Sequence, residues 1–284
     1  MKHKRIVINS YLKIYFYEFK VIKMKHKRIV IKVGTSTLTY ENGKLNLRRL
    51  QHLCRVISDL QNAGNEIVLV SSGAIGVGVG KLGLKERPTS TRQKQAIAAV
   101  GQCELMFMYD KIFGEYNNTV AQVLLTRKVI DNPQLRQNAF NTFEELIGMC
   151  IIPVVNENDT VATDELEGAN FGDNDMLSAL VARVVNADLL IIMTDIDGLY
   201  ETNPREDPYA KLLKRVPEIT DEIKHMAGGT GSNRGTGGMS TKVSAAEVAT
   251  KAGIECCVLN GNNPEVLYDI MEGHNPGTIF EAVN

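Results

Sequence analysis

Short, strongly apolar runs alternate with longer helical periods along most of this chain. Six runs are predicted as strands: 28–32, 66–71, 120–125, 151–156, 189–194 and 254–259. Apolar positions recur at helical spacing near 46–62, 91–116, 134–149, 174–186, 239–251 and 264–271. Gly64 and Gly253 stand where helices should end, just before strands. Buried strands separated by helices predict an α/β fold, a three-layer α/β/α sandwich with a mainly parallel central sheet.

The composition is that of an ordinary globular enzyme, with 284 residues, 44% hydrophobic residues, 23% charged residues and a net charge of −1. The near-neutral charge gives no basic footprint for nucleic acid, and no apolar run approaches the roughly 20 residues of a membrane span. Five cysteines form no C-x-x-C pair, which favours reduced thiols and a cytoplasmic location. Cys256 and Cys257 fall in an apolar strand pattern and are interpreted as core. The scattered histidines predict no protein-held metal site.

The first 23 residues are interpreted as an N-terminal extension without a functional role. MKHKRIVI occurs at 1–8 and again at 24–31, and only the second copy continues into a glycine turn. Residues 1–28 carry nine Lys or Arg and one acid. A start-site artefact explains this repeat, with Met24 as the functional start; a basic segment that lies on a membrane surface is the alternative.

A glycine-dense turn, GTGGMSTK at Gly235–Lys242, opens a predicted helix. Glycines let backbone N–H groups crowd an anion, the helix N-terminus adds partial positive charge, and Lys242 supplies a full charge. We interpret this turn as a phosphate site, with a flexible loop that caps a helix as the alternative. It is not a P-loop, because the chain contains no G-x-x-x-x-G-K-[ST].

A second lysine is expected at the same edge of the sheet. Lys32 ends the first apolar run and precedes Val33-Gly34-Thr35-Ser36. Open α/β sheets bind ligands at the carboxyl ends of their strands, so Lys32 and Lys242 are predicted to face one polyphosphate. Taken singly, each lysine would be read as an ordinary surface charge.

Polar residues follow the other strands too: Ser71-Ser72-Gly73-Ala74, Asn156-Glu157-Asn158-Asp159, Gly172-Asp173-Asn174-Asp175 and Thr194-Asp195. Asp173 and Asp175 could equally be ordinary caps at a helix N-terminus. The loop from Thr194 to Pro204 could hold a nucleotide base and ribose. Gly78-x-Gly80-x-x-Gly83 formally matches a dinucleotide motif, but it lies well beyond the strand end, and we interpret it as close backbone packing and a mobile loop.

These residues favour phosphoryl transfer, in which catalysis is mostly positioning and charge neutralisation. No nucleophile with a partner base is evident, since no histidine is spaced to serve Ser72. A carboxylate acceptor, with a pKa of about 4.3, is ionised at neutral pH and needs no general base. The two lysines and a magnesium ion would then offset the repulsion between two anions.

Five motifs, in one order, resemble those of glutamate 5-kinases in the amino acid kinase family. They are Ile31–Ser36, Ser71–Ala74, Asn156–Asp159, Gly172–Asp175 and Gly235–Lys242, and the resemblance covers residue 24 to the end. It implies that ATP, with Mg²⁺, phosphorylates the side-chain carboxylate of L-glutamate to glutamyl 5-phosphate, the first step of proline biosynthesis. It also implies an amino-acid-binding lobe at about 24–186 and a nucleotide-binding lobe at about 187–284.

The resemblance assigns roles to individual positions. Lys32 and Lys242 would neutralise the transferring phosphoryl group, and Asp175 would orient them. Three residues would hold glutamate: Ser72, Asp159 and Asn174. The nucleotide site would be lined by Lys32, Thr194, Asp195, Thr236, Gly237, Gly238, Met239, Ser240, Thr241 and Lys242. Homo-oligomers and inhibition by proline are expected, whereas the C-terminal PUA domain of many members is not found after Gly277–Phe280.

Two other readings remain open at this point. A catalytically silent amino-acid or nucleotide sensor could be built on the same fold, and loss of either lysine would favour it. A dinucleotide-dependent oxidoreductase would be distinguished by binding NAD rather than ATP.

Overall fold

A single eight-stranded sheet forms the centre of the molecule, and the computed structural model describes it through residues 28–162, 174–228 and 238–283. The strand order is β3-β4-β2-β1-β5-β7-β8-β6. The strands are β1 (Arg28–Val33), β2 (Glu66–Ser71), β3 (Val120–Leu125), β4 (Ile152–Glu157), β5 (Leu189–Thr194), β6 (Arg215–Val216), β7 (Glu255–Asn260) and β8 (Thr278–Phe280). Neighbouring strands run parallel except for β7 and β8. The six predicted strands are confirmed; β6 and β8, with two and three residues, were missed.

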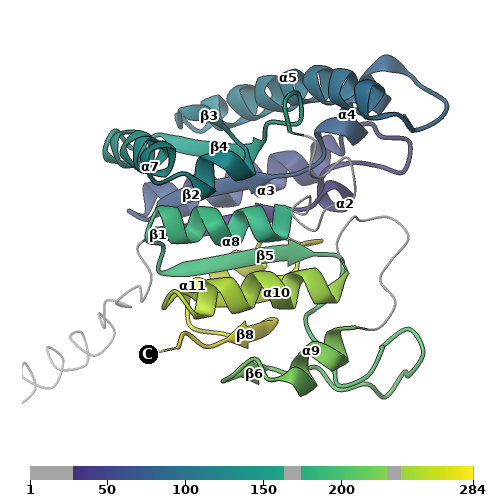
Figure 1. Cartoon of the computed structure of the whole chain (residues 1–284), viewed down its shortest axis with the longest axis vertical. Coiled ribbons are helices and arrows are strands. Elements are labelled where there is room, and N and C mark those ends of the chain that lie inside the picture. The colour runs from purple at the N-terminus through teal and green to yellow at the C-terminus, as the bar shows by residue number, and fades with distance from the viewer. Residues whose placement is uncertain (1–27, 163–173, 229–237, 284) are drawn as a thin grey trace, which may run out of the picture.

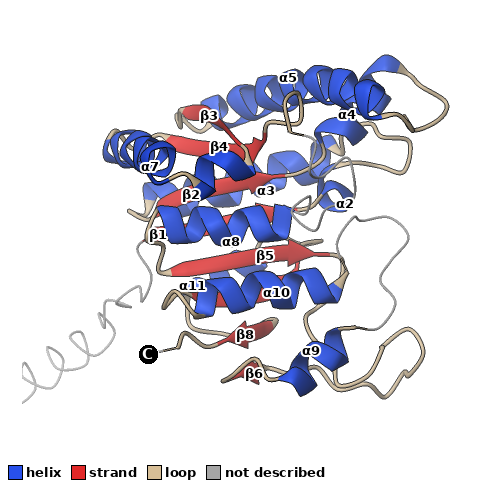
Figure 2. Ribbon diagram, in the orientation of Figure 1, coloured by secondary structure: helices blue, strands red, loops and turns tan. Residues whose placement is uncertain are grey.

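Helices cover both faces of this sheet, which confirms the predicted three layers (Figures 1 and 2). One layer holds α2 (Thr35–Leu38), α3 (Leu47–Asn62), α4 (Ala74–Leu82), α5 (Thr91–Glu115) and α11 (Val266–Met271). The other holds α6 (Arg127–Asp131), α7 (Pro133–Gly148), α8 (Asn174–Val184), α9 (Asp221–Ala227) and α10 (Met239–Thr250). The six predicted helices are confirmed to within a few residues at their ends.

Two hydrophobic cores lie on opposite faces of the sheet because successive strand residues point to opposite sides. Along β1, Ile29 and Ile31 pack against the α3–α5 layer, whereas Val30 packs against the α8–α10 layer. The vicinal Cys256 and Cys257 are fully buried free thiols, one in each core, as predicted.

The glycine-rich segment after β2 is a helix, not the mobile loop that the sequence suggested. Gly78 belongs to α4, which lies directly on α5. A Cβ atom on Gly78 would come 2.2 Å from the carbonyl oxygen of Ile97, and one on Gly101 would come 1.7 Å from that of Ala74. The predicted role in close backbone packing is therefore confirmed. Gly64 and Gly253, with φ of 97° and 77°, also follow helices as predicted.

The carboxyl ends of the parallel strands meet at one edge of the sheet, toward which the arrows of β2 and β5 point in Figure 2. In the ladders, Val33 of β1 is paired with Ser71 on one side and Met193 on the other. Because helices of an α/β fold run back against the strands, α8 and α10 begin at this same edge. The sheet therefore brings the predicted motifs to one place.

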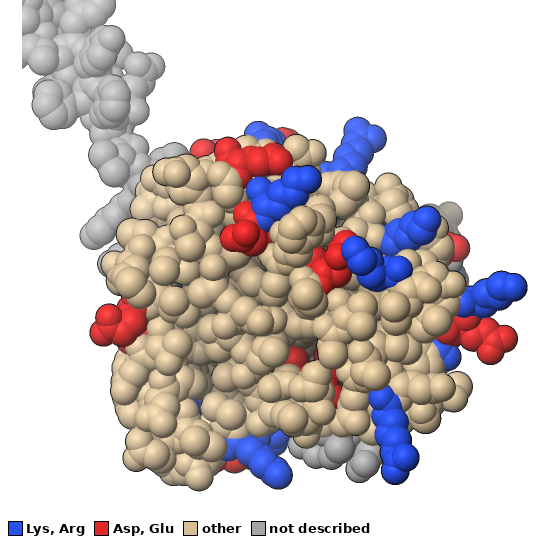
Figure 3. Space-filling view, turned by 90° about the horizontal axis from the view of Figure 1, so that it is seen from above, with Lys and Arg blue, Asp and Glu red and all other residues tan. Residues whose placement is uncertain are grey.

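The surface gives two further observations. On the face drawn in Figure 3, lysine, arginine and acidic side chains are interspersed rather than gathered into one basic patch. Among the helices that the structure describes, none is long and apolar enough to cross a membrane.

Candidate active site

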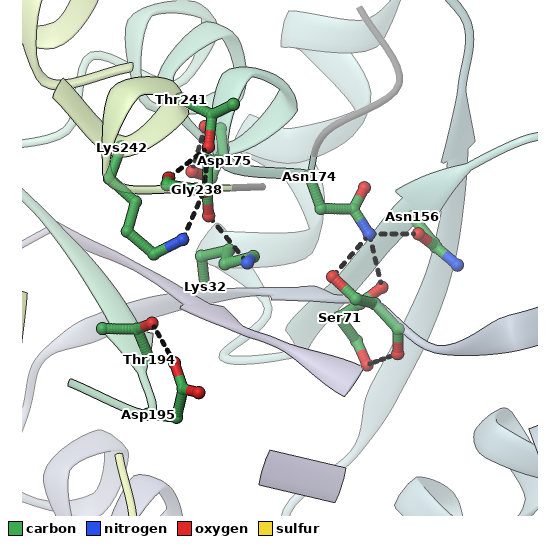
Figure 4. Close-up of polar contacts among 12 residues, drawn as sticks. Lys32, Ser71, Asn156, Asn174, Asp175, Thr194, Asp195, Gly238, Thr241 and Lys242 are labelled. Carbon is green, nitrogen blue, oxygen red and sulfur yellow. Dashed lines mark hydrogen bonds and ion pairs between the residues drawn. The ribbon is translucent and has the colours of Figure 1, made fainter. Parts of the chain in front are cut away.

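A buried carboxylate holds two lysines together at the carboxyl edge of the sheet. Asp175, in the first turn of α8, has no exposed surface. Its Oδ1 lies 2.7 Å from Lys32 Nζ, and its Oδ2 lies 3.0 Å from Lys242 Nζ. Figure 4 shows the three side chains converging from β1, α8 and α10. The lysines that the sequence placed at separate glycine turns thus share one partner.

This arrangement fixes the charge of Asp175. Burial alone would raise the pKa of its carboxyl, but the adjacent Lys32 and Lys242 ammonium groups outweigh burial and hold that pKa well below the ordinary value of 3.8. The ionised carboxylate in turn keeps both lysine ammonium groups at the edge of the sheet. Two ammonium groups are thus held together at one place, which suits an anionic ligand.

The start of α10 completes the positive cluster. Gly238 is the N-cap, and Thr241 Oγ1 lies 3.0 Å from Asp175 Oδ2 and 2.9 Å from the Gly238 carbonyl oxygen. Met239 and Ser240 occupy the first turn before Lys242. The N-terminus of α10 therefore directs its partial positive charge toward the same edge as both lysines. Thr236 and Gly237 lie outside the described residues, as does Gly235.

A second, neutral cluster lies beside the first, because Asn174 precedes Asp175 in the chain. Asn174 Nδ2 donates to Ser72 Oγ at 2.8 Å and to Asn156 Oδ1 at 3.0 Å, and it lies 3.5 Å from the Ser71 carbonyl oxygen. The structure therefore brings together two of the three residues predicted to hold glutamate. The third, Asp159, lies half-buried in the turn that leaves β4, three residues after Asn156.

The loop after β5 forms a third cluster. Thr194 Oγ1 donates to Asp195 Oδ1 at 3.2 Å, and Arg205 lies 4.0 Å from the other carboxylate oxygen of Asp195. Asp197 accepts from Asn260 Nδ2 at 2.8 Å and from the Tyr200 hydroxyl at 3.0 Å. These contacts tie the predicted nucleotide loop to the end of β7.

Sequence reasoning missed the contribution of α5. Asn156 Nδ2 donates to Gln102 Oε1 at 2.8 Å, and the Tyr109 hydroxyl lies 2.8 Å from Ser71 Oγ. Burial raises the pKa of Tyr109, so its phenol stays neutral. Gln102 and Tyr109 lie two helical turns apart on one face of α5, which is a spacing of ordinary core residues. No local pattern indicates that these two residues lie beside the site, whereas Asp197 follows a strand end and could have been found.

The arrangement is suited to the transfer of a phosphoryl group. Two ammonium groups and a helix N-terminus face the place where negative charge would build up, and uncharged hydrogen-bonding groups lie next to it. The lysine pair would bind a polyphosphate, and the Ser72–Asn174 cluster would hold a small polar acceptor.

Comparisons with known proteins agree with this geometry. A model of the amino acid kinase family matches residues 27–260. The chain is 61% identical over 253 residues to a glutamate 5-kinase of Clostridium perfringens (strain 13 / Type A), covering 89% of this chain and 94% of that protein. A glutamate 5-kinase of Listeria innocua serovar 6a is 56% identical over 253 residues, covering 89% and 92%.

Solved structures of two UMP kinases share the fold. The enzyme of Bacillus anthracis superposes with a TM-score of 0.61 at 18% identity, covering 91% of this chain and 97% of that chain. The enzyme of Ureaplasma parvum gives 0.60 at 15% identity, covering 90% and 98%. At these identities the two structures show the fold alone, whereas the family model and the bacterial relatives show the family. The chain belongs to the amino acid kinase family, in its glutamate 5-kinase branch.

Proposed function

We propose that this protein transfers the γ-phosphoryl group of ATP to the side-chain carboxylate of L-glutamate, which gives glutamyl 5-phosphate for proline synthesis. The observation that carries the proposal is the pair of ion pairs from Lys32 and Lys242 to one buried carboxylate, at 2.7 and 3.0 Å. Two ammonium groups fixed in this way can neutralise a phosphoryl group passing between two anions. The family and the glutamate 5-kinase relatives support the choice of substrates.

The chemistry requires no general base. A side-chain carboxylate has a pKa of about 4.3, so the attacking oxygen is already ionised at neutral pH. It forms a bond to the γ-phosphorus while the bond from that phosphorus to the β,γ-bridging oxygen breaks, and ADP leaves. Lys32 and Lys242 lower the barrier because they stabilise the transition state, in which negative charge is spread over the transferring group and develops on the leaving oxygen.

The neighbouring clusters receive the remaining roles. Ser72, Asn174 and Asp159 hold glutamate, whose ammonium group calls for an acidic partner that Asp159 supplies. Thr194 and Asp195 line the nucleotide site together with the segment from Thr236 to Lys242. Asp175 orients the two lysines and does not contact the reacting atoms. The proposed division into an amino-acid-binding and a nucleotide-binding lobe would fall between β1 and β5, which are neighbours in the sheet.

Magnesium fits this site as a companion of the nucleotide. Both oxygens of Asp175 face lysine ammonium groups, so this carboxylate is not placed to hold a cation. Over the part of the chain that the structure describes, no group of three or more His, Cys, Asp or Glu side chains could hold a metal ion. Mg²⁺ keeps much of its water and is commonly bound through substrate phosphates. It would therefore enter with ATP and add positive charge at the β- and γ-phosphates.

No observation favours the alternative functions. A silent sensor would not need two lysines fixed on one carboxylate. In the formal dinucleotide motif, Gly78 packs against Ile97 of α5, Gly80 packs against Gly43, and Gly83 ends α4. Inhibition by proline and assembly into homo-oligomers stay predictions.

The proposal is tested by ADP release with ATP, Mg²⁺ and a panel of small acids, together with trapping of the acyl phosphate by hydroxylamine. Glutamate should release ADP and yield the hydroxamate, whereas aspartate and N-acetylglutamate should do so poorly. Equal turnover of N-acetylglutamate, or NAD binding in place of ATP binding, would contradict it.

A further inference from the structure

Three amide side chains form a relay from the interior of α5 to the candidate substrate site. Asn156 Nδ2 donates to Gln102 Oε1 at 2.8 Å, and Asn174 Nδ2 donates to Asn156 Oδ1 at 3.0 Å. Asn156 is nearly fully buried, at 3% exposure, and the other two are half-buried. An amide has a donor end and an acceptor end, so each link sets which end the next residue presents.

The far end of the relay is anchored by groups that accept hydrogen bonds. The Ser71 carbonyl oxygen, 3.5 Å from Asn174 Nδ2, can only accept, and Ser72 Oγ accepts at 2.8 Å. The NH₂ group of Asn174 therefore faces Ser71, Ser72 and Asn156. Because the Ser71 contact is long and the Ser72 hydroxyl can donate as well as accept, the hydrogen bond to Asn156 contributes to holding the amide in this orientation. Figure 4 shows the Asn174 carbonyl oxygen on the opposite side, turned away from all three acceptors.

This orientation gives the substrate site one acceptor next to one donor. Asn174 presents its carbonyl oxygen, which can accept a hydrogen bond but cannot donate one. Ser72 accepts from Asn174 and keeps its own hydroxyl hydrogen for donation. An α-amino acid offers the matching pair of groups, an ammonium that donates and a carboxylate that accepts.

We propose that Gln102 is a positioning residue for amino-acid specificity, because through Asn156 it turns the Asn174 carbonyl oxygen toward the α-ammonium group of the substrate. The inference rests on the proposed function and deepens it. It also specifies how Asn174 would hold glutamate, since its carbonyl oxygen would accept a hydrogen bond from the ammonium group. Specificity for a free amine then depends on a residue that does not touch the substrate.

Removing the acceptor at position 102 should release this orientation. With methionine, which matches glutamine in length but is a poor acceptor, the buried Asn156 NH₂ loses its partner. Asn156 can then turn over and present its NH₂ to Asn174, which in turn would offer its own NH₂ to the substrate. The ammonium group would lose an acceptor and meet a donor. Glutamate should bind more weakly, whereas the affinity of a ligand without the ammonium group should stay unchanged.

The test compares glutamate with glutarate, which has the same two carboxylates and no ammonium group. The full chain is assayed for ADP release with ATP and Mg²⁺, giving the KM of glutamate and the Ki of glutarate as a competitor. Gln102→Met should raise the glutamate KM by about 10- to 100-fold, the value of a hydrogen bond to a charged group. The Ki of glutarate, the KM of ATP and kcat should change little.

Gln102→Glu is the matched control, since a carboxylate still accepts from Asn156. Its added charge weakens glutarate, which has no ammonium group, at least as much as glutamate, so the quantity to compare is the ratio of the glutarate Ki to the glutamate KM. That ratio should stay at or above the wild-type value in Gln102→Glu and fall in Gln102→Met. Thermal unfolding of both variants shows whether the comparison is made on folded protein.

Three results would overturn the inference: an unchanged ratio in Gln102→Met, an equal rise for glutamate and glutarate, or the same fall of the ratio in Gln102→Glu. If Gln102→Met does not fold, the ratio in Gln102→Glu still decides, because a loss there shows that the acceptor is not what matters. Failure of the wild-type protein to phosphorylate glutamate is a different outcome, which removes the proposed function itself.

Discussion

The ammonium nitrogen of Lys32, at the end of β1, lies 2.7 Å from the buried carboxylate of Asp175. The second oxygen of the same carboxylate lies 3.0 Å from Lys242. One carboxylate thus contacts two buried ammonium groups that would otherwise repel each other. The predictions for this site follow from which of the three charges is removed.

Lys32→Met and Lys242→Met should each lower kcat by about 10²–10³, the usual cost of losing one donor to a developing negative charge. The glutamate KM should change less, because the lysines act most strongly on the transition state. Lys251→Met is a suitable control, since Lys251 is exposed and pairs with Glu247 on the surface. Steady-state ADP release decides, and a near-normal kcat in either lysine variant would contradict the assigned role.

Asp175→Asn should abolish most activity and also lower stability. Asparagine is ordinarily tolerated near a helix N-terminus, but here the change leaves two buried lysine charges without their shared counter-charge. Breaking a buried ion pair by removing one partner costs about 3–5 kcal/mol. The free energy of unfolding, measured in urea, and kcat should therefore both fall. Added ATP should restore part of the lost stability because it binds to the folded state.

The control for that variant is Asp269→Asn, which removes one negative charge from an exposed position on α11. It should leave both stability and turnover unchanged. If Asp175→Asn proved as stable as the control while losing activity, the ion pairs would matter for catalysis alone.

The stability contributed by Asp175 should depend on pH in one direction. Because the ion pairs hold its folded pKa below 3.8, the unfolded chain binds this proton more readily than the folded protein does. The contribution is therefore complete above about pH 4 and is lost as the pH falls toward the folded pKa. The difference in unfolding free energy between wild type and Asp175→Asn, measured in urea, should shrink below about pH 4. A constant difference down to about pH 3 would contradict the low pKa.

Much of the fold was predictable because its strands are short, apolar and separated by helical periods. Lys32 and Lys242 were expected to converge because Lys32 ends a strand before a glycine turn, and Lys242 follows a glycine turn that opens a helix. The sequence could not settle Asp175, since an acid in the first turn of a helix is explained equally by capping. Only its burial between two ammonium groups separates the two explanations.

The missed features have local physical causes. Residues 74–82 carry three glycines within nine positions, which lowers helix propensity, yet they form α4. These glycines allow close packing, with Gly78 against Ile97 of α5 and Gly80 against Gly43. Gln102 lies mid-helix, where a polar residue ordinarily faces solvent. Its contact with Asn156 arises from the packing of α5 against the sheet, and no local pattern encodes that contact.

The close approach of α4 and α5 leads to a paired prediction on one helix. Gly101→Ala would place a Cβ atom 1.7 Å from the Ala74 carbonyl oxygen, so the two helices must separate. Overpacking of this kind costs about 1–3 kcal/mol. In Gly114→Ala the added Cβ atom would have no neighbouring atom within 4 Å, so this variant should be more stable by about 0.5–1 kcal/mol. The Tm should fall in Gly101→Ala and rise in Gly114→Ala. A shift of α5 in Gly101→Ala should also raise the glutamate KM, because Gln102 is the next residue.

Asp159→Asn should raise the KM of glutamate far more than the KM of ATP. The ammonium group of the substrate requires a negatively charged partner, and Asp159 lies half-buried in the turn after β4, three residues beyond Asn156. A hydrogen bond to a charged group contributes roughly 1.5–3 kcal/mol, which corresponds to a KM increase of about 10- to 100-fold. Glutarate, which has no ammonium group, should bind the variant at least as well as it binds the wild type, because a negative charge near its carboxylates has been removed. Measured KM and Ki values for the two ligands decide the point: if glutarate weakens in parallel with glutamate, Asp159 maintains the structure of the turn and does not recognise the ammonium group.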